Sequence, residues 1–153
     1  MNKIQKLIAE LCPQGVEFKK LGEVCEISRG VRVVRKQLTE SGKFPVYQNS
    51  LTPLGYYHKK NCNAGTSFVI CGGAAGQVGY SNVDFWAADD CLFIICSKEL
   101  QSKFLYYSLL CKQDFLLSQV RKASVPRLSR SVVENLQIPL PPLAIQQEIV
   151  NIL

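Results

Sequence analysis

The chain has 153 residues, of which 47% are hydrophobic and 20% are charged. A chain of this size forms one domain with one core and is too short for two ordinary domains. Its balance of apolar and charged residues excludes intrinsic disorder. The longest apolar run, Cys91–Cys96, is far shorter than the roughly 20 residues of a membrane-spanning helix, and the segment after Met1 lacks the apolar centre of a secretion signal. We therefore expect a globular protein of the cytoplasm, with no membrane association.

The formal net charge of +6 is concentrated in two segments. Residues 19–36 carry six basic and two acidic side chains, and residues 112–130 carry five basic and one acidic side chain. Residues 84–99 are net acidic. If the two basic segments fold onto one face, they form an electrostatic surface for a polyanion. The alternative is an ordinary solvated basic surface, and charge alone leaves both open.

Seven cysteines and one histidine are the residues that could bind a transition metal. The cysteines form no CxxC pair, so the sequence predicts no zinc site. Several of them stand in apolar runs, where a thiol behaves as a small hydrophobic group. We expect reduced thiols and a reducing compartment.

Apolar residues at helical spacing, among them Ile4, Leu7 and Leu11, predict an amphipathic helix over residues 2–11. From Val16 onward the spacing shortens, and Gly, Asn, Ser and Pro separate the apolar stretches. The middle of the chain is therefore expected to be mainly β. Strands are predicted at residues 17–20, 24–28, 44–48, 66–71, 77–81, 91–96 and 136–138.

A helix is predicted over residues 101–111, and it is expected to continue over 114–120 after a break. The buried stripe of the first helix is predicted to be Phe104, Leu105, Ser108 and Leu109. Ser131 and Glu134 match a capping box and predict a short helix. Pro142 is expected at the first position of a final helix. The apolar residues of this helix are Leu143, Ile149, Val150 and Leu153.

Four glycines lie between Val69 and Tyr80, directly after a predicted strand. The segment lacks the Lys-Ser/Thr ending of a phosphate-binding P-loop, and a strand follows it instead of a helix. We therefore expect a strand-turn-strand unit in which glycine supplies positive φ. Glycine also permits close approach of a ligand, which would place Gly73 and Gln77 at the tip of a binding loop.

Two further segments have side chains suited to DNA. Gln48 and Asn49 could pair with the major-groove edge of adenine, and Arg29, Arg32 and Arg35 could contact guanine or phosphate. The alternatives are a polar hairpin and a solvated basic strand. For catalysis the carboxylates are few: Asp89 and Asp90 have no third acid or histidine nearby in sequence, and the Asn-Pro-Pro-Tyr or Asp-Pro-Pro-Tyr signature of amino-methyltransferases is absent.

Several stretches, in this order and spacing, resemble the DNA specificity subunits of type I restriction-modification systems. The most specific is the proline-rich exit Ile138-Pro-Leu-Pro-Pro-Leu-Ala-Ile-Gln-Gln-Glu148. The others are Phe18–Gly30, Phe44–Tyr47, Ile70–Tyr80, Phe85–Cys91, Phe104–Tyr107 and Val125–Ser129.

The resemblance implies an α+β fold: a mixed, curved β-sheet target recognition domain with short flanking helices and a C-terminal amphipathic helix. Residues 1–15 would form an N-terminal helical segment, residues 16–141 the recognition domain, and residues 142–153 the truncated start of a spacer helix. We expect the last segment to pack on the 2–11 helix of the same chain or, in a weak homodimer, of a second copy.

The resemblance also implies sequence-specific binding of double-stranded DNA without catalysis, reading one half of a bipartite site. The implied partners are a DNA methyltransferase (modification) subunit and, through the complex, a motor-nuclease (restriction) subunit. No cofactor is expected in this chain; S-adenosylmethionine, ATP and magnesium would belong to the partners. The alternatives are a module that docks on methyltransferase subunits without reading DNA, and a nucleic-acid-modifying enzyme. The implied DNA-binding residues are Arg29, Arg32, Arg35, Lys36, Tyr47, Gln48, Asn49, Ser50, Gly73, Gln77, Lys122, Ser124 and Arg127.

Overall fold

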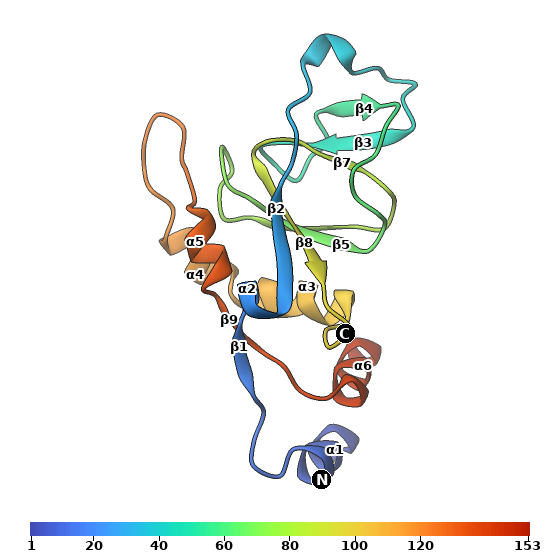
Figure 1. Cartoon of the computed structure of the whole chain (residues 1–153), viewed down its shortest axis with the longest axis vertical. Helices are drawn as coiled ribbons and strands as arrows, with labels where there is room; N and C mark the ends of the chain where they lie inside the picture. Colours follow the sequence, from blue (N-terminus) through green and yellow to red (C-terminus); the bar gives the residue numbers. More distant parts are fainter.

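A four-stranded antiparallel sheet forms the middle of the molecule in the computed structural model, which describes residues 1–153 (Figure 1). Its strands, in spatial order, are β2 (Cys25–Arg29), β8 (Cys91–Cys96), β5 (Thr66–Ile70) and β6 (Val78–Ser81). Four consecutive residues of the inner strand β5 are buried. This burial without alternation, from Ser67 to Ile70, is typical of a strand that is covered on both faces.

Short helices cover one face of this sheet and enclose the main core. They are α2 (Leu21–Val24), α3 (Ser102–Cys111), α4 (Gln113–Ser118) and α5 (Arg130–Glu134). The buried residues of α3 are the four that the sequence predicts, Phe104, Leu105, Ser108 and Leu109. Phe104, Leu105 and Leu109 pack with Ile27, Val69 and Leu92 of the sheet. The stripe on α3 therefore fixes which side of the sheet becomes the main core.

A second, smaller sheet lies beyond one end of the central sheet (Figure 1). It contains β4 (Gly55–Tyr57), β3 (Phe44–Tyr47) and β7 (Trp86–Ala87), and a single turn of 3₁₀ helix, η1 (Arg35–Gln37), lies near it. β3 pairs antiparallel with β4 and parallel with β7. The smaller sheet is therefore mixed, the central sheet is antiparallel, and the fold is α+β, as predicted.

The opposite end of the molecule contains both termini (Figure 1). There β1 (Phe18–Lys20) pairs with β9 (Gln137–Pro139), and α1 (Lys3–Leu11) lies beside α6 (Leu143–Ile152). Lys3 Nζ and Glu148 Oε1 form an ion pair at 3.0 Å between these two helices. The expected packing of the first helix on the last therefore occurs within one chain.

Three details of the helix ends differ from the predictions. Ser129, and not Ser131, caps α5: its Oγ accepts from the main-chain N–H of Ser131 at 3.2 Å, which places Ser131 inside the helix. Pro142 precedes α6 as its N-cap instead of occupying its first turn. The buried residues of α6 are Ile145 and Gln146, whereas Leu143 and Leu153 are exposed.

The elements that the sequence did not predict are α2, η1, β4 and β7. None has more than four residues. The helices of the fold are all shorter, or less apolar, than a helix that could cross a lipid bilayer.

Candidate nucleic-acid interface

Three loops that are far apart in sequence meet at the end of the central sheet where β5 leads into the glycine turn. The main-chain N–H of Ala74 donates to the carbonyl of Asn49 at 2.9 Å. The N–H of Gly73 donates to the carbonyl of Pro126 at 3.2 Å, and the N–H of Leu128 donates to the carbonyl of Cys71 at 2.9 Å. Main-chain bonds thus join three of the four segments that the sequence singles out. We call them the amide-rich loop (residues 47–50), the glycine turn (residues 72–77) and the basic loop (residues 121–127).

The glycine turn connects β5 to β6, and Gly73 and Gly76 have φ of +87° and +90°. This confirms the predicted strand-turn-strand unit with glycine at positive φ. A Cβ at position 73 would lie 2.7 Å from Cβ of Asn49, so the close approach that glycine permits is to a neighbouring loop of the same chain.

Gln77 lies at the base of this turn, where its carbonyl accepts from the N–H of Ile70 at 3.0 Å. This corrects the expectation that it projects from the tip. Its side chain lines a hollow of about 320 Å³ together with Lys122 and Pro126. Gln77 and the basic loop therefore share one concave part of the surface.

The loop after β3 presents its polar residues unequally. Asn49 is exposed, Gln48 is half-buried, and the Oγ of Ser50 accepts from the N–H of Thr52 at 3.2 Å, which stabilises the turn. The ring of Tyr47 packs inward, with its centroid 4.9 Å from that of Phe68 and 5.5 Å from that of Phe85. Burial raises the pKa of Tyr47. The structure therefore places Tyr47 in a small core beneath the loop instead of on the readout surface.

The segment after β2 forms a second exposed basic region. Val33 is buried against Val46 and Tyr57 of the small sheet and against Ala88, which follows β7. Arg32, Arg35 and Lys36 are exposed. These three residues have no hydrogen bond that joins them to the three loops. Arg29, at the end of β2, lies closer to the loops, because its guanidinium is near the Cys71 thiol. Burial raises the pKa of this thiol, and the nearby arginine offsets part of that rise.

The basic loop projects from the body of the molecule beside α5 (Figure 1). Arg121 and Arg127 close its base through two main-chain bonds of 2.8 and 3.1 Å. Lys122 and Ser124 lie exposed beyond this closure. Arg127 pairs with Asp90 at 2.8 Å, and Arg130 pairs with Glu134 at 2.5 Å. Lys122 is therefore the exposed lysine of this loop that has no ion pair.

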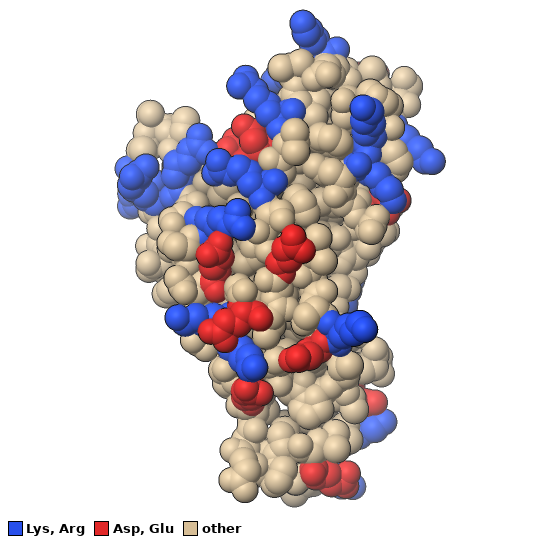
Figure 2. All heavy atoms as spheres, viewed as in Figure 1, with Lys and Arg blue, Asp and Glu red and all other residues tan.

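On the face that Figure 2 shows, lysine and arginine predominate over the half that contains this loop and the small sheet. On the same face, acidic and basic side chains are mixed over the half with α1 and α6 (Figure 2). Part of the first basic segment belongs to that second half, because Lys19 lies on β1 and pairs with Glu17 at 3.6 Å. The expectation that two whole basic segments share one face therefore needs correction: Arg29–Lys36 lies toward the basic half, and Lys19 does not.

A match to a family model identifies this domain. The model for the type I restriction modification DNA specificity domain matches residues 13–153. The chain belongs to this family. The chain is 31% identical over 156 residues to the type I restriction enzyme MpnII specificity subunit of Mycoplasma pneumoniae. The alignment covers 97% of this chain and 47% of that relative.

Solved structures share the fold of this specificity domain. The S subunit of a type I restriction-modification system from M. genitalium aligns with a TM-score of 0.84 at 21% identity, over 90% of this chain and 38% of that one. The HsdS subunit of Thermoanaerobacter tengcongensis aligns with a TM-score of 0.72 at 21% identity, over 97% of this chain and 40% of that one. The chain spans 38% to 65% of the length of the first curated relatives that it matches.

Two residues of structural consequence were not predicted. The sequence marks Asp90 only as one of two adjacent acids without a third acid or histidine nearby, and the structure pairs it with Arg127. Gln146 is fully buried in α6 and bonds to three main-chain groups. The sequence gives no signal that separates Gln146 from the polar residues Gln147 and Glu148 that follow it.

Proposed function

We propose that this domain reads one half of a bipartite site in double-stranded DNA and thereby directs partner subunits to that site. The observation that carries the proposal is the joining of three polar and basic loops by main-chain hydrogen bonds at the basic end of the fold. Exposed amide side chains such as Asn49 can read base edges, while Lys122, Arg32 and Arg35 supply charge to the phosphates.

In this proposal the domain specifies a sequence, and other subunits carry out the chemistry. A methyltransferase subunit would bind S-adenosylmethionine and modify adenine, and a motor-nuclease subunit would use ATP and magnesium. The family description and the relatives named as specificity subunits support this division of labour. Because the proposed ligand is DNA, we also propose that the protein acts in the cytoplasm.

Binding of a randomised duplex library, followed by selection and sequencing, tests the proposal directly. We expect one enriched half-site and an affinity that falls with salt. If about four to six phosphates are neutralised, log affinity against log salt has a slope of about −4 to −5. Absence of duplex binding at low salt would contradict the proposal and favour a module that only docks on methyltransferase subunits.

Two substitutions separate readout from charge. Asn49→Ala should relax preference at one base pair by roughly 1–3 kcal/mol, whereas Lys122→Ala should weaken all sequences alike and lower the salt slope by about one. Lys6→Ala is the matched control, since Lys6 is exposed on α1 at the opposite end of the fold. Equal losses on selected and random duplexes for Asn49→Ala would remove this loop from base readout.

A further inference from the structure

Arg127 is held differently from the other basic side chains of the interface. Its Nη1 donates to Oδ1 of Asp90 at 2.8 Å. The Asp90 side chain is 17% exposed, whereas that of Arg127 is 46% exposed. The remaining N–H donors of Arg127 have no partner within the chain. The basic interface residues that form no ion pair at all are Arg29, Arg32, Arg35, Lys36 and Lys122.

The pair forms over Gly72. The main chain of Gly72 is bridged to Arg127 on one side, and the N–H of the preceding Cys71 donates to the Asp90 carbonyl at 2.8 Å on the other. Asp90 and Arg127 therefore flank the glycine. A Cβ at position 72 would lie 2.6 Å from both Nη1 of Arg127 and Oδ1 of Asp90. The space in which the two side chains meet exists because residue 72 has no side chain.

The main chain of Arg127 is fixed as well. It exchanges two hydrogen bonds with Arg121, and the next residue, Leu128, bonds to Cys71 and is buried. Arg127 is thus attached both to the closure of the basic loop and to the end of the central sheet, next to the inner strand β5. Both the origin and the orientation of its guanidinium are set before any ligand binds.

This arrangement suits one of the two roles that arginine plays at DNA. A side chain that only neutralises phosphate needs no fixed orientation, and a carboxylate beside it weakens the attraction because it repels the phosphate. A side chain that reads guanine must present its planar fork to O6 and N7 in a defined orientation. A neighbouring carboxylate that holds one edge of the fork supplies that orientation.

We infer that Arg127 reads a guanine in the half-site and that Asp90 is the positioning residue that holds its guanidinium in the reading orientation. The inference rests on the proposed function, because it assigns a base type and a second residue to the same surface. Asp90 acts in two ways. It anchors Nη1, and its charge disfavours a phosphate at the free edge of the guanidinium, which leaves a base edge as the preferred partner.

The test uses the full chain and the selected half-site. We expect that half-site to contain a G·C pair whose preference falls by roughly 5- to 150-fold in Arg127→Lys, since lysine keeps the charge but lacks the fork. Asp90→Ala should cause a comparable loss of preference at the same base pair while binding random duplex as well as, or better than, the parent, because a negative charge is removed. Gly72→Ala should reduce the same preference without any change of charge.

Asp84→Ala is the matched control, since it removes an acid that pairs with Lys60 at 2.9 Å and should leave the preference unchanged. Thermal unfolding of each variant shows whether the fold persists. If Asp90→Ala is unfolded, the base preferences of Gly72→Ala and Arg127→Lys still test the assignment. The assignment is overturned, and the proposed function kept, by either of two results. One is an equal loss of affinity for selected and random duplexes in Asp90→Ala, and the other is a preference for the G·C pair that survives in Arg127→Lys. A parent protein without any sequence preference overturns both the assignment and the proposed function.

Discussion

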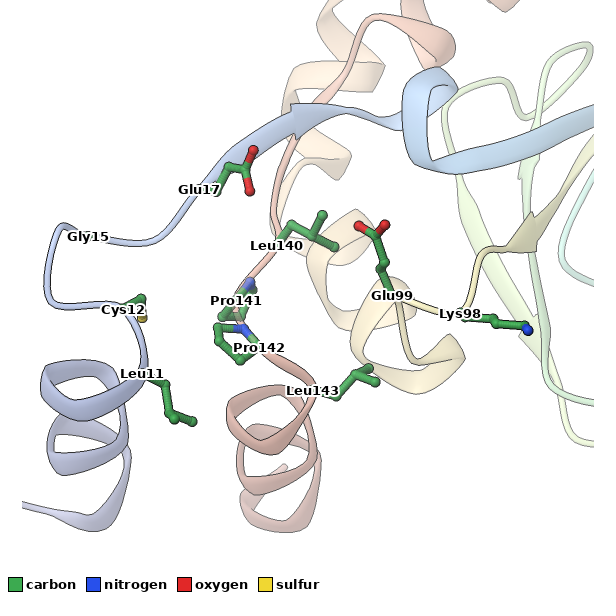
Figure 3. Close-up of a pocket in the computed structure, with 10 residues that line it drawn as sticks. All are labelled: Leu11, Cys12, Gly15, Glu17, Lys98, Glu99, Leu140, Pro141, Pro142 and Leu143. Carbon is green, nitrogen blue, oxygen red and sulfur yellow. The ribbon is translucent and has the colours of Figure 1, made fainter.

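Replacing Gln146 should destabilise the fold by severing the link between α6 and the rest of the domain. Its Oε1 accepts from the N–H of Gln101, and its Nε2 donates to the carbonyls of Glu99 and Pro141, each at 2.8 Å. The side chain is fully buried. Glu99 and Pro141 lie on segments that face each other across a hollow of about 470 Å³ beside the start of α6 (Figure 3).

The expected loss follows from these three bonds. At about 1 kcal/mol for each hydrogen bond, Gln146→Ala should cost about 3 kcal/mol of the free energy of unfolding. That is a large share of the roughly 5–15 kcal/mol that stabilises an ordinary domain. With an m-value of about 2 kcal/mol/M, the urea midpoint should fall by about 1.5 M.

Urea unfolding followed by circular dichroism measures the loss, with Gln147→Ala as the matched control. Gln147 is exposed and bonds only to the side chains of Gln101 and Asn151, so its removal should change stability by about 0.5 kcal/mol or less. Gln146→Glu should also destabilise, because one carboxylate oxygen would face two carbonyls, and the loss should shrink on acidification as the carboxyl is protonated. Similar small losses for Gln146→Ala and Gln147→Ala would refute the reasoning.

Three further predictions concern the interface, the thiols and the termini. Gly73→Ala should displace the loop at Asn49 and abolish sequence preference, because the new Cβ would lie 2.7 Å from that residue at a φ of +87°; selection on the variant should recover no half-site. A small alkylating reagent at pH 8 should label Cys111, which is exposed, and leave Cys62 unmodified until the chain unfolds. Burial raises the pKa of Cys62 to about 12, which keeps this thiol neutral at pH 8. Mass spectrometry of digests distinguishes the two sites. Sedimentation at micromolar concentration should show a monomer, because α6 packs on α1 of its own chain; a dimer that is lost on deletion of residues 142–153 contradicts this.

Continuous or repeated apolar patterns give the most accurate of the sequence predictions. The run Cys91–Cys96 forms β8 with the predicted bounds, and the stripe on α3 is buried as predicted. β4 and β7 contain only three and two residues, so no period can develop in them. They exist through pairing with β3, which for β7 joins residues about forty positions apart in sequence, such as Val46 and Trp86.

The sequence predicts which types of residue form the candidate site, but it does not predict how the loops that carry them are arranged in space. Glycine, amide and basic residues mark the three loops, but their contact depends on hydrogen bonds between distant main-chain groups, which no local pattern reports. Tyr47 shows the limit most clearly. Val46 is buried against Val33 and Tyr57, while Tyr47, on the opposite face of the same strand, packs on Phe68 and Phe85. A strand covered on both faces leaves no outward position for an aromatic ring.

The way in which the loops are joined also bears on how this surface can acquire different specificities. The bonds from Ala74 to Asn49 and from Gly73 to Pro126 use main-chain atoms, and such bonds do not depend on which side chain the residue carries. Side chains at positions such as 48 and 49 can therefore change without loss of the arrangement that presents them. Gly72 and Gly73 are different, because any Cβ there would collide with Asp90 and Arg127 or with Asn49. The interface thus combines fixed positions that assemble the loops with free positions that determine which bases are read.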